Sequence, residues 1–168
     1  NSCSRVHRPA QLDYIGVKRF DEQGNVVGED RFIGLFGSAY YTNSALELPL
    51  IKSKVAAVCD SSPFAKGTHD YKTLINILET YPRDEILQSP VEELLKTVTG
   101  ILQMQERDYC GFFVRRDAFD RFYSCMVYVP RERYNTKLRI ETQELFQEVF
   151  NSSEDVEFTT FFSESVHA

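Results

Sequence analysis

Residues Ser89–Leu102, SPVEELLKTVTGIL, carry the clearest structural signal in the sequence. Ser89 fits an N-cap, Pro90 the first helical position and Glu92 the third, which predicts a capping box in which the two side chains bond free backbone N–H groups. Apolar residues then recur at helical spacing, at Val91, Leu94, Leu95, Val98 and Leu102. The stretch therefore predicts an amphipathic helix with one face packed against a core.

Two further helices are expected before this one. Pro49 fits the first position of one helix. Thr68 or Asp70 can cap a second helix, which Pro82 ends. The three helices together predict a helical block over residues 49–105.

Alternating apolar residues flank the helical block on both sides. Residues 13–36 contain two runs rich in β-branched and aromatic types, joined by the turn residues 21–25, which predicts a first hairpin. Residues 112–129 repeat this pattern and predict a second hairpin. A helix over 136–150 and a last strand over 156–166 complete the chain. This order favours an α+β fold with an antiparallel sheet of about five strands, covered by helices on one face.

The composition excludes several classes of protein. With 168 residues, 42% of them hydrophobic, the chain is expected to fold as a single domain, 1–168. Its net charge of −6 repels phosphate backbones and anionic lipid surfaces, so no nucleic-acid and no membrane partner is expected. No apolar run approaches the ~18–20 residues of a membrane span. The chain opens with Asn1 rather than Met, and we expect it to be excised from a longer protein.

The four cysteines do not form a pattern that holds a metal. Cys3, Cys59, Cys110 and Cys125 show no CxxC and no paired Cys/His spacing. A domain of this size does not need disulfides, so a reducing, cytoplasmic compartment is expected.

Catalytic candidates are few, and no catalytic, cofactor-binding or metal-binding residue is predicted. His69 precedes Asp70 at the start of a helix, where a capping role is favoured over a catalytic dyad. Cys59 lies on an apolar helical face, where a thiol is inert. An enzyme built on His69 with Asp70 or Cys59 is the least favoured hypothesis.

Charge is polarised along the chain. Eight basic and four acidic residues lie between Arg107 and Arg139, whereas seven acidic and no basic residues follow Arg139. The arginines of this region suit an anion site, a face that docks on a neighbouring domain or subunit, or a solvated hairpin edge. The candidate anion or docking patch comprises Arg115, Arg116, Arg121, Arg131 and Arg133.

Three strings of sequence carry a resemblance to a known family. DYIGVKRF (13–20) with GEDRFIGLF (28–36), LETYPRDE (78–85), and FVRRD (113–117) with the run 121–134 resemble a segment of the large-type bacterial NAD-dependent glutamate dehydrogenases. The resemblance extends from about His7 to His167. It implies a parent enzyme that oxidises L-glutamate to 2-oxoglutarate and ammonium with NAD as the cofactor. It places this segment in the N-terminal region of PAS-like and ACT-like modules, which lacks the catalytic residues.

The resemblance also bears on the fold and on the partners. A helical block between two early strands and a later hairpin is the order of a PAS-like fold. An ACT-like module, β-α-β-β-α-β, fits the whole chain less well because two strands precede any helix. The leading hypothesis is a non-catalytic regulatory or oligomer-scaffolding module, with other domains or subunits of the parent enzyme as partners. The alternative is a small-molecule sensor that binds an amino acid or another anionic effector in a pocket between the sheet and the helical block.

Overall fold

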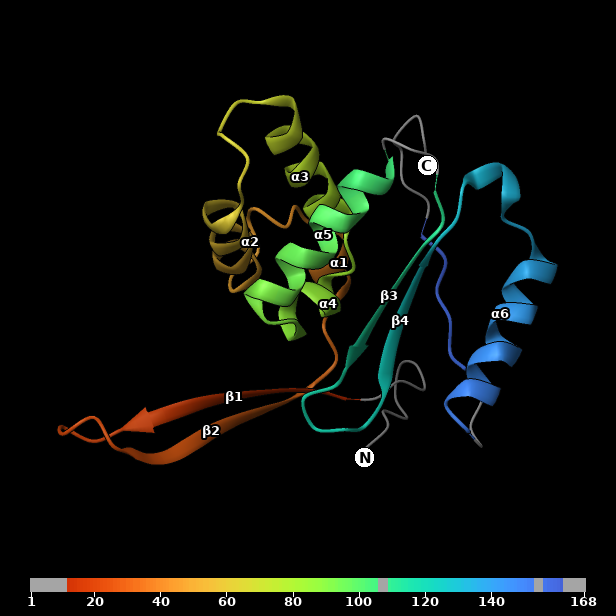
Figure 1. The fold of residues 1–168 in the computed structure, drawn as a ribbon. Helices are drawn as coiled ribbons and strands as arrows, with labels where there is room; N and C mark the ends of the chain where they lie inside the picture. The colour runs from red at the N-terminus through yellow and green to blue at the C-terminus, as the bar shows by residue number, and fades with distance from the viewer. Residues whose placement is uncertain (1–11, 106–108, 153–155, 162–168) are drawn as a thin grey trace. The chain divides into compact units, whose positions relative to one another are not determined.

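The computed structural model describes residues 12–105, 109–152 and 156–161. The chain divides into two compact units, which meet between Asn43 and Ser44 (Figure 1). Whether both units belong to the single domain expected from the sequence stays a prediction.

The first unit is an antiparallel ribbon followed by a short helix. Strands β1 (Asp13–Phe20) and β2 (Val26–Gly34) pair from Asp13 opposite Gly34 to Arg19 opposite Gly28, with a bulge after Arg19. The predicted turn is confirmed, because the Asp21 carboxylate accepts the backbone N–H groups of Gln23 and Asn25. Gly24 takes a positive φ of 83° in this turn. Helix α1 (Ser38–Thr42) was not expected from the sequence.

The second unit begins with four helices. They are α2 (Ile51–Ser61), α3 (His69–Thr80), α4 (Arg83–Gln88) and α5 (Val91–Gln105). Helix α5 packs against α2 and α3, and α2 also packs against α4. The core takes its fully buried side chains from all four helices: Val55, Val58, Leu74, Leu78, Ile86, Leu94, Val98 and Ile101. The apolar stripe of α5 is as the sequence predicts. The helical block contains four helices rather than the three expected, because the short α4 follows Pro82.

The helix starts and ends follow from specific polar contacts. Thr68 caps α3, because its hydroxyl accepts the Tyr71 N–H at 3.3 Å. The capping box expected at Ser89 is wrong: neither the Ser89 hydroxyl nor the Glu92 carboxylate makes a cap hydrogen bond within the described residues. Ser89 instead closes α4, where its N–H donates to the Glu85 carbonyl at 2.9 Å and its carbonyl accepts from the Lys54 ammonium at 2.8 Å.

A second hairpin follows the helical block. Strands β3 (Gly111–Arg116) and β4 (Tyr123–Tyr128) pair antiparallel, with Gly111 opposite Tyr128 and Arg116 opposite Tyr123. A 3-10 turn, η1 (Arg131–Arg133), and helix α6 (Thr136–Val149) come next.

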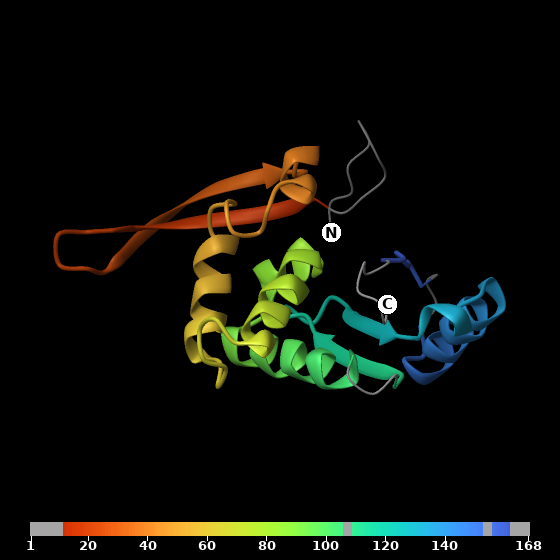
Figure 2. The same cartoon turned by 90° about the horizontal axis from the view of Figure 1, so that it is seen from above.

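The hairpin lies between the helical block and α6 in both views (Figures 1 and 2). Neighbouring side chains of a strand point to opposite faces. Phe113 meets α5 at Gly100, where an added Cβ would lie 3.0 Å from the Phe113 ring. Phe112 points the other way and contacts Phe146 of α6, with ring centroids 5.4 Å apart.

The expected five-stranded sheet is not formed by the described residues. They form two separate two-stranded sheets, β1–β2 and β3–β4, in an α+β chain. The last expected strand, 156–166, is irregular over 156–161, and residues 162–166 lie outside the described residues. The Val156 carbonyl accepts a hydrogen bond from the Gln143 side chain at 2.7 Å, so a contact with α6 replaces a strand ladder there.

Leu78→Ala tests the core of the helical block. Leu78 is fully buried, so its truncation should lower the free energy of unfolding by about 2–5 kcal/mol. Leu145→Ala is the control, because 54% of Leu145 is exposed and its loss should cost less than about 0.5 kcal/mol. Denaturant unfolding of both variants measures the difference, and equal losses would contradict the assigned core.

Candidate functional site

The arginines of the candidate patch lie at two ends of the β3–β4 hairpin. Arg115, Arg116 and Arg121 are at the end with the turn, whereas Arg131 and Arg133 follow the opposite end of β4. The five residue steps from Gly111 to Arg116 separate these ends by about 17 Å, at ~3.3 Å per step. The five arginines therefore do not converge on one small anion. The use of either group for anion binding or docking stays a prediction.

Arg115 joins the hairpin to the helical block. Its Nε and Nη2 donate to the two Glu85 carboxylate oxygens, each at 2.8 Å, and Nη2 also donates to Gln88 Oε1 at 3.0 Å. The two side chains are only 11% and 14% exposed. The hydrogen bonds to Glu85 raise the pKa of Arg115, so its guanidinium stays charged at neutral pH.

The turn between β3 and β4 is organised by Asp117. Its buried carboxylate accepts the N–H groups of Phe119 and Arg121, and also binds the Arg121 guanidinium through two nitrogens at 2.8 and 3.0 Å. The Arg121 guanidinium and these N–H groups hold the pKa of Asp117 well below its ordinary range. Arg116 pairs with Asp120 at the surface. Three of the five patch arginines thus have carboxylate partners within this chain.

The candidate catalytic side chains are not brought together. His69 is exposed at the first position of α3. Among the described residues, no hydrogen bond or ion pair joins its ring to Asp70 or Cys59. Burial raises the pKa of the Cys59 thiol, which keeps it protonated. The side chain that caps α3 is Thr68, so the capping role favoured for His69 is wrong, and the inert thiol of Cys59 stays a prediction.

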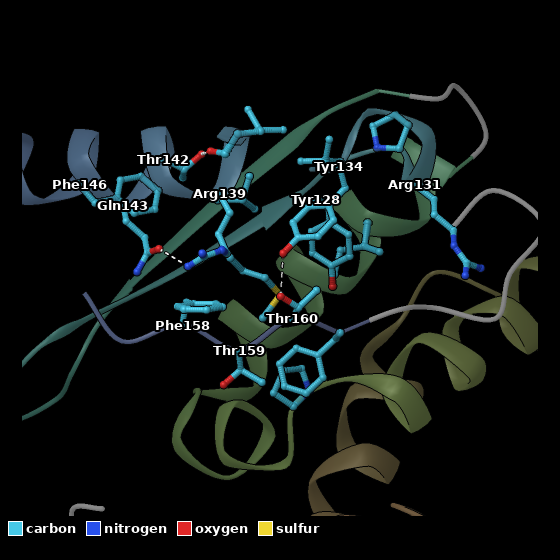
Figure 3. A pocket seen from close by; sticks show the side chains of 18 of the residues that line it. Tyr128, Arg131, Tyr134, Arg139, Thr142, Gln143, Phe146, Phe158, Thr159 and Thr160 are labelled. Atoms are coloured by element: carbon cyan, nitrogen blue, oxygen red, sulfur yellow. Dashed lines mark hydrogen bonds between the residues drawn. The ribbon is translucent and has the colours of Figure 1, made fainter. Parts of the chain in front are cut away.

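A pocket of about 330 Å³ lies between β4, α6 and residues 156–161 (Figure 3). The helical block contributes part of its wall through Ile77, Ile101 and Met104. Most of the lining is apolar, and the volume is within the range of small-molecule sites. The sequence-based hypothesis of a pocket between the sheet and the helical block did not anticipate the walls formed by α6 and 156–161.

Arg139 of α6 is the charged group at the centre of this pocket. Its Nη1 donates to Gln143 Oε1 at 2.7 Å, and its Cζ lies 4.1 Å from the centroid of the Phe158 ring. Figure 3 shows the Phe158 ring lying flat against the guanidinium. Gln143 also donates to the Val156 carbonyl at 2.7 Å, so it positions Arg139 and holds residues 156–161 against α6.

Tyrosines supply the other polar groups of the pocket. The Tyr134 hydroxyl and the Thr160 hydroxyl are 2.9 Å apart and share a hydrogen bond. Burial raises the pKa of Tyr128 to about 12, so its phenol is neutral. The pocket thus combines two arginines, Arg131 and Arg139, and one carboxylate, Glu157, with hydroxyl groups and an apolar wall.

Arg139 and Gln143 were not among the site residues expected from the sequence. Their four-residue spacing on a predicted helix places both on one face, and Arg139 is the last basic residue before the acidic end of the chain. The sequence therefore indicated that Arg139 and Gln143 share a helix face. The contact with Phe158 is not encoded by any local pattern, because it needs residues 156–161 to fold back on α6.

Two family profiles match the chain. The glutamate dehydrogenase helical motif 1 matches residues 48–107, and the glutamate dehydrogenase ACT2 domain matches residues 112–168. These bounds separate the helical block from the β3–β4 hairpin and α6. An ACT-like assignment is thus supported for residues 112–168, although the element order of the whole chain disfavoured it. The reason is that β1 and β2 lie outside that region, so they do not belong in its element order.

Curated relatives match nearly the whole chain. The NAD-specific glutamate dehydrogenase of Halomonas elongata is 44% identical over 98% of this chain, and that of Pseudomonas aeruginosa is 45% identical over 98%. The enzyme of the same name from Mycobacterium tuberculosis is 32% identical over 90%. The chain spans about a tenth of the length of these relatives. No solved structure matches it.

The fold and the matched profiles define a pair of modules, a helical motif followed by an ACT domain, of the kind that forms part of a larger enzyme. The chain belongs to the NAD-specific glutamate dehydrogenase family and corresponds to one segment of the members of that family.

Two kinds of feature are absent from the described residues. None of their helices has the length and apolar character to cross a membrane. They contain no cluster of three or more His, Cys, Asp or Glu side chains suited to a metal ion.

A double-mutant cycle tests the ion pair between Arg115 and Glu85. Arg115→Gln, Glu85→Gln and the double variant should give a coupling free energy of about 1–3 kcal/mol, because both groups are shielded from water. Arg116→Gln is the matched control, since Arg116 is 62% exposed and its loss should cost less than about 0.5 kcal/mol. Additive losses in the cycle, measured by denaturant unfolding, would contradict the pairing.

The lowered pKa of Asp117 predicts a pH-dependent contribution to stability. The ionised carboxylate stabilises the folded state fully at pH values well above its ordinary pKa of 3.8, and this contribution is lost progressively as the pH falls below 3.8 toward the lowered pKa of the folded state. Asp117→Asn should therefore lower the thermal midpoint at pH 7, with a difference from the original chain that shrinks toward pH 3. Asp120→Asn, at an exposed site, should change little at either pH. A difference that stays constant with pH would show that the charge of Asp117 is not responsible.

Proposed function

We propose that this chain is a non-catalytic regulatory or oligomer-scaffolding module of an NAD-dependent glutamate dehydrogenase. The parent enzyme would convert L-glutamate, NAD and water to 2-oxoglutarate, ammonium and NADH, in a cytoplasmic, bacterial setting. The names of the relatives support the parent reaction and its cofactor. The partners of the module are other domains or subunits of that enzyme, with no role for nucleic acid or membrane.

The observation that carries this proposal is the exposed apolar surface of the β1–β2 ribbon. Within the described part of the chain, its two strands pair with each other and with no other strand. Seven large apolar side chains of the ribbon are between 49% and 64% exposed: Tyr14, Val17, Phe20, Val26, Val27, Phe32 and Ile33. A two-stranded hairpin is marginally stable by itself in water, so this ribbon requires a covering surface.

Charged side chains between the apolar ones make the ribbon suited to a specific partner. Arg19 pairs with Asp30 across the strands, and Arg31 pairs with Glu29. Such charges on open strand edges oppose unselective aggregation. A partner surface would have to match both the apolar side chains and this charge pattern, as expected for a permanent neighbour within one enzyme.

A second candidate function, the sensing of a small effector, rests on a different observation. The pocket at Arg139 offers two arginines, one carboxylate, the Tyr134 and Thr160 hydroxyls and an apolar wall within about 330 Å³. This combination is typical of small-molecule sites. The two functions are compatible, because the ribbon and the pocket use different residues.

Paired substitutions on one face of the ribbon test the scaffolding function. Phe32 pairs with Ile15 across the strands, and paired residues point to the same face. Ile15 and Val17 are two positions apart in β1, so Val17 and Phe32 lie on the same face of the ribbon. In the parent enzyme, Val17→Asp with Phe32→Asp should shift the assembly to smaller oligomers, since a buried unpaired carboxylate costs several kcal/mol. Light scattering measures the mass of the assembly.

Gln23→Asp is the control for this experiment, because it adds a carboxylate to the ribbon outside the two substituted positions. Gln23 is exposed in the turn of the hairpin, away from the apolar face, and its replacement should leave the oligomer unchanged. A double variant with the original mass and thermal midpoint would contradict the proposal that this face is covered in the parent enzyme. Circular dichroism checks that the helical block of the variant is folded.

A further inference from the structure

The turn between β3 and β4 carries the most exposed large apolar side chain of the described residues. Phe119 is 75% exposed, and two further aromatic side chains follow it, Phe122 at 37% and Tyr123 at 49%. A single exposed apolar residue is ordinary, whereas a cluster of them marks an interaction surface. Residues 116–123 are called the aromatic turn below, and they join the two strands at one end of the hairpin (Figure 1).

The Arg121 guanidinium organises the rings of the aromatic turn. Its Cζ lies 5.3 Å from the centroid of the Phe119 ring and 5.6 Å from that of Phe122. Asp117 holds the guanidinium in this place through Nε and Nη2. Cation–π contacts of this kind favour a fixed arrangement of the two rings around the cation. The turn thus presents two rings and one guanidinium as a single ordered surface.

The backbone of the aromatic turn is ordered as well. The Asp117 N–H donates to the Phe122 carbonyl at 3.0 Å, and the Asp120 N–H donates to the Asp117 carbonyl at 3.0 Å. Asp120 takes a positive φ of 55°, a conformation that Asp tolerates better than most residues. An ordered turn loses little conformational entropy when it binds, so the burial of its rings contributes more fully to affinity.

The polar groups of the turn indicate what the rim of a partner is like. Arg121 Nη1 makes no hydrogen bond with a described residue, so its two N–H groups can donate to a partner oxygen. Arg116 adds a second guanidinium, which is 62% exposed beside Asp120. Aromatic and arginine side chains are the usual anchors of protein interfaces. The turn therefore fits a socket with apolar walls and an oxygen acceptor, above all a carboxylate, at its rim.

The large pocket of a second copy of this chain does not meet that description. Its lining carries Arg131 and Arg139 against a single carboxylate, Glu157. This positive charge would repel the arginines of an incoming turn. The chain covers about a tenth of the length of its relatives, so most of the parent enzyme lies outside this segment and can supply the socket.

We propose that the aromatic turn docks into an apolar socket in a part of the parent glutamate dehydrogenase outside this segment. Phe119 fills the socket, Phe122 packs at its edge, and Arg121 donates to an oxygen at its rim. Asp117 is a positioning residue, because it is buried and holds Arg121 and the turn backbone from within. The inference deepens the scaffolding function proposed above and rests on it, because it names a docking surface besides the ribbon.

Hydroxyl-radical footprinting of the intact parent enzyme tests whether Phe119 is covered. The oxidation rate of Phe119 should be at least about fivefold lower in the native enzyme than in the unfolded enzyme, because a docked anchor is screened from water. A turn without a partner leaves Phe119 75% exposed, and its oxidation rate would then stay within about twofold of the unfolded rate.

Two variants of the parent enzyme separate anchoring from a general change in exposure. Phe119→Asp should release the turn and raise the oxidation rate of Phe122 by about twofold or more, because a buried carboxylate without a partner is unfavourable. Phe119→Leu keeps an apolar anchor and should leave Phe122 protected. Asp120→Asn is the matched control, because it changes an exposed neighbour in the same turn and should alter neither rate.

A photoreactive side chain at position 119 identifies the occupant. With p-benzoylphenylalanine in place of Phe119, irradiation should cross-link the turn to a peptide outside residues 1–168. The same probe in place of Lys137, which is 83% exposed, is the control and should cross-link at least about fivefold less. The proposal is overturned if native Phe119 is oxidised at the unfolded rate, if the cross-linked peptide lies within residues 1–168, or if Phe119→Asp leaves Phe122 protected.

The failure of this inference can be told from the failure of the scaffolding function at the ribbon. Oligomer mass reports on the ribbon, whereas the oxidation rate of Phe119 reports on the aromatic turn. An enzyme whose mass falls in the ribbon variants but whose Phe119 is freely oxidised overturns the socket and leaves the ribbon interface standing. A protected Phe119 in an enzyme whose mass does not respond to the ribbon variants supports the socket and overturns the ribbon interface.

Discussion

The bidentate contact between Arg115 and Glu85 is the polar interaction that joins the two modules of the second unit. Glu85 lies in the helical motif and Arg115 in the ACT domain, so one ion pair spans the boundary between the matched profiles. Lys54 lies near the same place, where its ammonium bonds the Leu87 and Ser89 carbonyls at 2.6 and 2.8 Å. Burial lowers the pKa of Lys54, and the charge of Arg115 adds to this effect. The cluster concentrates charge at a place where helices and hairpin must meet in one orientation.

The pocket depends on that orientation. Its wall takes side chains from α3 and α5 on one side, and from β4 and α6 on the other. If the hairpin moved relative to the helical block, the apolar part of the wall would open, whereas Arg139 and Gln143 would move with α6. A ligand that touches both sides would bind best when Arg115 and Glu85 are paired. Such a dependence couples ligand binding to the contact between modules, without any new element.

Local sequence patterns predicted most of the elements but not their assembly. The α5 stripe and the Asp21 turn were predicted because periodicity and turn residues act within a few positions. The prediction of a five-stranded sheet failed because the alternating pattern of a hairpin does not specify which other strands it pairs with. Ser89 failed as an N-cap because its backbone was needed to close α4 and to bind Lys54. Long-range partners such as Glu85 for Arg115, thirty residues apart, leave no local signal.

The opposite contacts of Phe112 and Phe113 have a consequence for the length of the loop at 117–122. Side chains alternate strictly along a strand, so the number of residues in this loop fixes which faces of β3 and β4 coincide. Adding or removing one residue would shift the pairing of β4 by one position, and its core-facing and α6-facing side chains would exchange places. Although Phe119 and Asp120 are exposed, the loop is therefore constrained in length. Surface loops commonly accept insertions, but an insertion in this loop would shift the register of the whole hairpin.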